Sequence, residues 1–164
     1  MSLDTTIGGA TADSYATIIE SDAYHVKFNN TSWATLDTVS KEAALRVGVR
    51  YVDGYQYSGQ VATYTQALQW PRVDAYRNCY VLPYTTIPQG IKDAQCEAAL
   101  RQSLGLLLTD LSAGSVTEET VGPITVKYAN GTNDGVTSFP MIDSLLKPFF
   151  AEGIGAYQHQ LVRT

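Results

Sequence analysis

The chain has 164 residues, a hydrophobic share of 45% and a formal net charge of −5 at pH 7. This length predicts one domain, and the acidic balance argues against a protein that wraps nucleic acid, because such proteins neutralise phosphates with Lys and Arg. No apolar run approaches the roughly 20 residues that a membrane span needs, and the first nine residues lack a signal-peptide pattern.

The N-terminal part begins with small and polar residues, so we expect a flexible lead-in over residues 1–12. Residues 14–19 are compatible with a short extended piece. Ser21 is the expected N-cap of a helix that runs to about Phe28. Trp33 and Leu36 follow as expected buried residues of a short turn.

A longer helix is predicted from about Thr38 to Asp53, with Asp37 as its N-cap. One stripe of this helix is apolar and is expected to face the core: Val39, Ala43, Val47 and Tyr51. The opposite stripe carries charges at spacings of three and four, where ion pairs form: Glu42, Arg46, Arg50 and Asp53. A short helix from Thr63 to Gln69 and a tyrosine-rich loop over 74–85 are expected next.

The central element of the prediction is a helix from Thr86 to Leu111. Thr86 and Gln89 have the spacing of a capping box, and Gly114 lies where a left-handed C-terminal residue is favoured. The helix has a narrow face of mainly small residues, which are Ile91, Ala94, Ala98 and Gly105. A broad apolar face lies on the other side and comprises Cys96, Leu100, Leu104, Leu107 and Leu111. A helix with two apolar faces must be covered on both.

Beyond this helix the apolar period changes to that of a strand, with Ile124, Val126 and Tyr128 alternating with polar residues. Residues 116–121 are suited to a partner strand, and Gly122-Pro123 forms either a hairpin turn or a bend in one edge strand. Pro140 starts a last short helix to about Lys147. The fold class predicted is therefore mainly α with a short β element (α+β).

The sequence contains no motif that predicts a catalytic, metal or cofactor site. The chain lacks a phosphate loop and a GxSxG motif, and His25 and His159 lie in distant regions. A loop at 130–135 has some calcium-loop character, but Met141 occupies the position of the closing Glu. We expect no enzyme, no metal and no cofactor, and we interpret Cys79 and Cys96 as reduced structural residues.

Aromatic residues leave two interpretations open. Trp70 and the tyrosines of the 74–85 loop could stack on unpaired bases, for which Arg72 and Arg77 would be a sparse supply of positive charge. The favoured interpretation is that these aromatic side chains pack over the helices or form a subunit contact.

Several segments, in their order, resemble the head–tail connector (adaptor, head-completion) proteins of tailed bacteriophages. The most specific are Trp70-Pro71-Arg72 and Val121-Gly122-Pro123-Ile124. Others are Ala12-Asp13-Ser14-Tyr15, Lys41-Glu42-Ala43-Ala44-Leu45, Tyr51-Val52-Asp53-Gly54 and Glu97-Ala98-Ala99-Leu100. Some members of this group carry the label DnaT-like single-stranded-DNA-binding protein.

The resemblance implies a homo-oligomeric ring, typically a dodecamer, in the neck of the virion, made in the host cytoplasm. Such a ring would lie between the portal protein and a tail terminator or stopper, and genomic DNA would pass through it without tight binding. We therefore interpret the chain as a structural connector, with single-stranded-DNA binding as the alternative.

The domain organisation predicted is a helical connector domain over 1–150, with its β element at about 116–129, and an extended C-terminal arm over 151–164. The hypothetical subunit interface comprises Val121, Gly122, Pro123, Ile124 and Val126. The hypothetical portal contact, which the resemblance places in the arm, comprises Tyr157, Leu161 and Arg163.

Overall fold

The structure is a computed structural model that describes residues 2–77, 79–105, 107, 118–121, 124–127 and 139–151. The elements in order are α1 (Ile18–Lys27), α2 (Thr31–Ala34), α3 (Thr38–Val52), β1 (Gln60–Val61), β2 (Arg72–Val73), β3 (Tyr76–Arg77), β4 (Tyr80–Val81), α4 (Gln89–Ser103), β5 (Glu118–Val121), β6 (Ile124–Lys127), α5 (Pro140–Leu146) and the 3-10 helix η1 (Lys147–Phe149). The predicted α+β class is confirmed.

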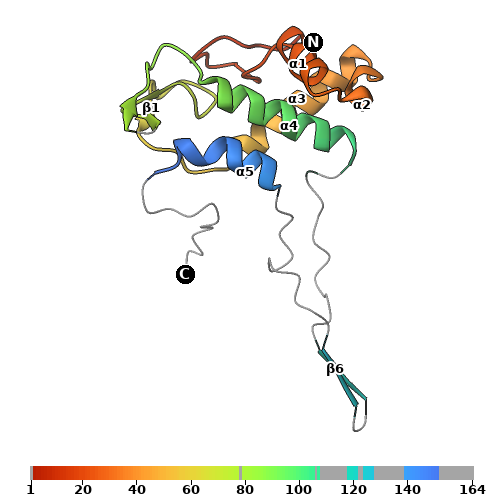
Figure 1. Ribbon diagram of the computed structural model, residues 1–164. Coiled ribbons are helices and arrows are strands. Elements are labelled where there is room, and N and C mark those ends of the chain that lie inside the picture. The colour runs from red at the N-terminus through yellow and green to blue at the C-terminus, as the bar shows by residue number, and fades with distance from the viewer. Residues whose placement is uncertain are drawn as a thin grey trace.

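Helix α4 lies at the centre of the helical body (Figure 1) and contacts α1, α2, α3 and α5. Both predicted apolar faces of its N-terminal part are covered: Ile91, Ala94 and Ala98 on one side, and Cys96 and Leu100 on the other, are buried. The prediction of a central helix covered on two sides is therefore correct. In the described part of the chain, no helix is both long enough and apolar enough to cross a membrane.

The predicted bounds of this helix are wrong at both ends. At the N-terminus, Pro88 takes the N-cap position without a side-chain cap, and the Gln89 side chain donates to Asp93 in place of completing a capping box. At the C-terminus, the helix stops at Ser103, and Gly105 adopts a φ of +71°. Leu104 consequently lies past the end with 53% of its surface exposed. Leu107 is buried outside the helix, and Leu111 lies outside the described residues.

Helix α3 confirms the predicted start, because the Asp37 side chain accepts a hydrogen bond from the Ser40 N–H. The predicted core stripe is wrong: Val39 is 73% exposed and Ala43 is exposed, while Val47 and Tyr51 are half-buried. The stripe that faces the core comprises Ala44, Leu45, Gly48, Val49 and Val52. Gly48 explains this rotation. A Cβ there would lie 2.9 Å from the carbonyl oxygen of Gln95, so the glycine allows the backbones of α3 and α4 to approach closely.

The entry to α1 also differs from the prediction. Thr17 caps the helix, and Glu20 completes a reciprocal capping box with it. Ser21, the predicted cap, lies inside the helix and is buried. The lead-in is tied down by hydrogen bonds from the Asp13 N–H to the Asp4 carbonyl and from the Ala67 N–H to the Gly9 carbonyl.

The segment between α3 and α4 forms two short ladders where a helix and a loop were predicted. Strands β1 and β2 pair antiparallel, with Gln60 opposite Val73 and Val61 opposite Arg72. The intervening loop replaces the predicted 63–69 helix. The Gln66 side chain accepts from the Thr63 N–H and donates to the carbonyls of Leu68 and Pro71, so it stabilises the loop rather than a helix.

The C-terminal elements follow the prediction where they are described. Strands β5 and β6 form an antiparallel ladder in which Val121 faces Ile124, which agrees with a hairpin rather than one bent strand. Helix α5 begins at Pro140, as predicted. Gly122, Pro123, the side chains of the two strands and the arm from residue 152 onward lie outside the described residues.

Buried polar groups at the centre of the body are joined by Gln95, which is fully buried on α4. Its Oε1 accepts from the N–H groups of Tyr15 and Ala16, both at 3.0 Å. Its Nε2 donates to Ser14 Oγ at 2.7 Å and to the Leu45 carbonyl at 2.9 Å. One amide therefore connects the segment before α1, helix α3 and helix α4.

Candidate nucleic-acid interface

The antiparallel pair β3–β4 carries an exposed tyrosine opposite a cation. Its register places Arg77 opposite Tyr80 and Tyr76 opposite Val81. Residues opposite each other in a ladder share a face, and successive residues alternate, so Arg77 and Tyr80 share one face and Tyr76 and Val81 the other. Tyr80 is 78% exposed, whereas Tyr76 is 47% exposed.

The Arg77 side chain packs over the body of the protein. Its guanidinium carbon lies 5.5 Å from the centroid of the Phe149 ring, and β3 lies against η1, the element that contains Phe149 and Lys147. We call the exposed Arg77 and Tyr80, together with the exposed Lys147 of the adjacent element η1, the Tyr80 face.

The residues beneath this face are buried and closely packed. Phe149 is 1% exposed and packs edge-on against Trp70, with ring centroids 5.7 Å apart. Gly90 on α4 permits this placement, because a Cβ there would lie 2.9 Å from the Phe149 ring. The Leu82 N–H donates to the Ala75 carbonyl, and Ala75 is fully buried, so the base of β3–β4 is held in the core.

Trp70 is excluded as a stacking residue because it is 2% exposed. Its backbone N–H donates to the Tyr15 hydroxyl, which in turn donates to the Asp53 carboxylate. Burial raises the pKa of Asp53 despite these hydrogen bonds. The packing interpretation is therefore correct for Trp70, whereas Tyr76, Tyr80 and Tyr84 leave much of their surface in solvent.

Most cations of the helical body are already engaged by acids. Lys41 pairs with Asp22 at 2.9 Å, Arg46 with Asp13 at 2.6 Å, and Lys92 with Glu20 at 2.6 Å, while Arg101 pairs with Glu97. Arg72 is buried and donates to the carbonyls of Ser58 and Gly59, and burial lowers its pKa. It therefore cannot serve as a phosphate ligand.

The cations of the Tyr80 face differ from these. Among the described residues, Arg77 and Lys147 form no ion pair and are exposed. Lys27 and Arg50 are also unpaired there, but they lie in the last turns of α1 and α3, away from the β3–β4 pair in sequence. The Tyr80 face thus combines an exposed aromatic ring with cations that form no ion pair with any described residue.

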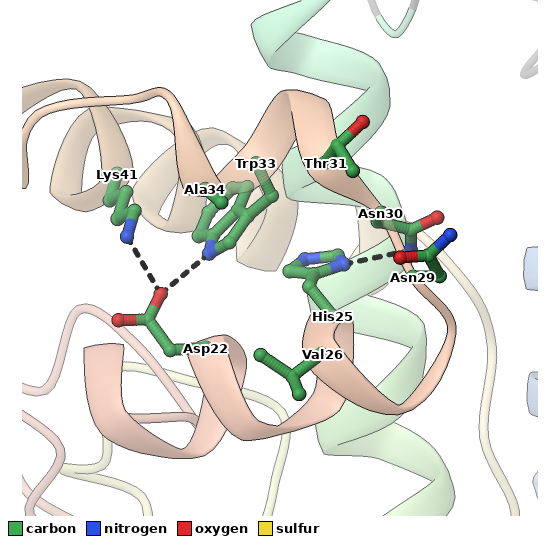
Figure 2. Close-up of a pocket in the computed structure, with 9 residues that line it drawn as sticks. All are labelled: Asp22, His25, Val26, Asn29, Asn30, Thr31, Trp33, Ala34 and Lys41. Carbon is green, nitrogen blue, oxygen red and sulfur yellow. Dashed lines mark hydrogen bonds and ion pairs between the residues drawn. The ribbon is translucent and has the colours of Figure 1, made fainter.

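A second surface feature, a hollow of about 310 Å³ beside α1 and α2 (Figure 2), is lined by Asp22, His25, Val26, Asn29, Asn30, Thr31, Trp33, Ala34 and Lys41. His25 packs against Trp33 with ring centroids 4.5 Å apart and the ring planes tilted by 37°, and its Nδ1 lies 3.1 Å from Asn30 Nδ2. Burial lowers the pKa of His25 to about 4. It is a neutral core residue, and the described part of the chain holds no His, Cys, Asp or Glu cluster suited to a metal.

The predicted interface and portal residues lie largely outside the described part of the chain. Val121, Ile124 and Val126 lie on β5 and β6 with only their backbones described. Gly122, Pro123, Tyr157, Leu161 and Arg163 lie outside the described residues, as does His159. The pairing of Arg77 with Tyr80 was missed. The available signal was two short β-prone runs separated by Asn78 and Cys79, since a two-residue spacing with Asn is typical of a hairpin.

Comparison with protein families shows that the model of the family described as "Putative DnaT-like ssDNA binding protein" matches residues 1–164. No curated protein and no solved structure matches the chain. The family match agrees with the DnaT-like label and favours single-stranded-DNA binding over the connector role, for which these comparisons provide no support.

Proposed function

The chain belongs to this DnaT-like family, and on that premise we propose that it binds single-stranded DNA weakly through the Tyr80 face. The observation that carries the proposal is an exposed tyrosine on β3–β4 with two cations, on β3 and the adjacent η1, that form no ion pair among the described residues. Single strands are bound by this combination, because an aromatic ring stacks on any unpaired base while cations hold the backbone.

The charge balance sets the expected strength and salt dependence. At most two cations contact phosphates, so the slope of log K against log salt should be no steeper than about −1.4, from about −0.7 per phosphate on a single strand. We expect a Kd of about 10⁻⁶–10⁻⁴ M, the range of non-specific binding. Duplex DNA should bind more weakly, because its bases are not available to Tyr80.

The test is fluorescence anisotropy of labelled dT20 and of a 20-base-pair duplex. Tyr80→Ala should weaken binding to dT20 about tenfold, since one stacked base contributes about 1–3 kcal/mol. Tyr64→Ala is the matched control, because Tyr64 is 97% exposed on a different loop. Equal affinity of the Tyr80 and Tyr64 variants would reject the Tyr80 face, and an absence of any binding by the native chain would reject the function.

A second candidate is the head–tail connector that the sequence resembles. The acidic balance supports it, because a net charge of −5 with most body cations paired to acids suits a wall past which DNA moves without being held. The β5–β6 ladder supports it too, since two strands alone are marginally stable in water and pairing between ring subunits would stabilise them.

Two variants test the connector candidate. Val126→Asp should prevent ring formation if β5–β6 joins neighbouring subunits of a ring at the virion neck. A chain ending at Phe150 should keep its melting temperature but fail to attach to portal-bearing heads if Tyr157, Leu161 and Arg163 contact the portal. Normal assembly of the first variant, or normal attachment of the second, contradicts the corresponding contact.

A further inference from the structure

Three cations of the described chain lie over aromatic rings, and they differ in one respect. Lys41 lies over Trp33 and Arg101 over Phe139, at 5.9 and 5.8 Å from the ring centroids. Both also form ion pairs, with Asp22 and Glu97. Arg77 lies over Phe149 at 5.5 Å and, among the described residues, has no carboxylate partner. Its charge and its outer surface are therefore available to a ligand.

The Arg77 side chain packs on the Phe149 ring, which is held in the core. Phe149 is buried between Trp70 and the close approach of Gly90, so the ring under the guanidinium is fixed. A guanidinium is planar and stacks on aromatic faces. The guanidinium carbon lies 5.5 Å from the Phe149 centroid and the Arg77 side chain is exposed, so the part of the guanidinium away from Phe149 is open to an unpaired base, which can stack on a guanidinium plane.

Resting on the proposed function, we infer that Arg77 is a stacking platform for an unpaired base rather than a phosphate ligand, and that with Tyr80 it takes two neighbouring nucleotides of a single strand. The ladder places these two side chains opposite each other on one face, where Cβ atoms lie about 4.5–5.5 Å apart. Two side chains at that spacing reach neighbouring bases. Lys147 on η1 then supplies charge to the backbone of the same strand.

The substitution that separates the two roles is Arg77→Lys. Lysine keeps the charge and loses the plane, so a phosphate contact would survive the change and a stacking contact would not. We expect Arg77→Lys to weaken binding to labelled dT10 about tenfold, as much as Arg77→Ala does, because a stacked base accounts for a change of this size. Arg50→Lys is the matched control, since Arg50 is exposed in the last turn of α3.

A second DNA ligand, which lacks bases, tests whether the loss of binding comes from stacking or from phosphate contacts. An oligomer of ten abasic sites keeps the phosphates and removes the bases, so Arg77→Lys should bind it as the native chain does. Far-UV circular dichroism and the melting temperature establish that each variant is folded. Native-like binding of Arg77→Lys to dT10, while Tyr80→Ala is impaired, overturns this inference and leaves the proposed function intact. A failure of the native chain to bind dT10 rejects both.

Discussion

The helical body and the Tyr80 face differ in whether their lysine and arginine side chains form ion pairs. On α3 and α4, Lys41, Lys92 and Arg101 are each held by an acid of the same chain. On β3 and η1, Arg77 and Lys147 form no ion pair in the described part of the chain. Net charge alone therefore misjudges this protein, because an acidic chain still holds two exposed cations, Arg77 and Lys147, on adjacent elements and without an ion pair among the described residues.

Hydrogen bonding shows the same contrast. In the helical body, Gln95 forms hydrogen bonds of 3.0 Å or less with four polar groups. Tyr80 of the Tyr80 face and Tyr84, four positions further on, are by contrast largely exposed to solvent. Changes in the body should therefore act on stability, and changes on the Tyr80 face on binding.

The largest effect is expected from Gln95→Leu. The change leaves the N–H groups of Tyr15 and Ala16 without an acceptor in a buried site, and each unsatisfied group costs about 1–3 kcal/mol. We expect the free energy of unfolding, measured in urea, to fall by about 3–5 kcal/mol. Gln89→Leu, at the exposed start of the same helix, should change it by less than about 0.5 kcal/mol. A loss below about 1 kcal/mol for Gln95→Leu would show that water replaces the amide.

A pair of leucine truncations tests where the body ends. Leu100→Ala should cost about 2–5 kcal/mol because Leu100 is buried between α3 and α4. Leu104→Ala should cost less than about 1 kcal/mol, since Leu104 lies past the end of α4 and is exposed. Urea unfolding measures both. Similar losses for the two variants would mean that the predicted broad apolar face extends through Leu104 after all.

Acid should weaken the α1–α2 end of the body through His25. Its folded pKa is about 4, below the usual 6.5, because burial disfavours the imidazolium. The unfolded chain then binds more protons between pH 6.5 and 4, so stability falls as pH drops through this window. Asp53, whose pKa burial raises, acts in the opposite direction. His25→Phe keeps the ring contacts with Trp33 and should flatten the fall in urea-unfolding free energy; an unchanged pH profile would contradict this account.

The smallest expected effect is on the salt dependence of DNA binding. It compares Lys147, which has no ion pair among the described residues, with Lys92, which has one. Lys147→Ala should make the slope of log K against log salt for dT20 shallower by about 0.7, the contribution of one phosphate contact on a single strand. Lys92→Ala should leave the slope unchanged, because Lys92 is held by Glu20. Anisotropy titrations at several salt concentrations measure both slopes. Equal changes would show that the ion pairs of the body do not withhold their cations from DNA.

Local signals in the sequence determined the type of most elements. Asp37 before a helical pattern predicted the start of α3, and its side chain does cap that helix. Pro140 predicted the start of α5, and the alternation around Ile124 predicted the β5–β6 ladder. These predictions succeed because capping, proline placement and strand period depend on residues within a few positions of each other.

Tertiary structure alone decided which faces and charges are used. The buried stripe of α3 follows from the approach of Gly48 to Gln95 on α4, not from the apolar period of α3 itself. Lys92 is neutralised by Glu20, which lies 72 positions away, and Trp70 is buried while Tyr80 is not. The folded structure determines which of its possible partners each side chain contacts. The Tyr80 face can therefore be identified only from the three-dimensional structure.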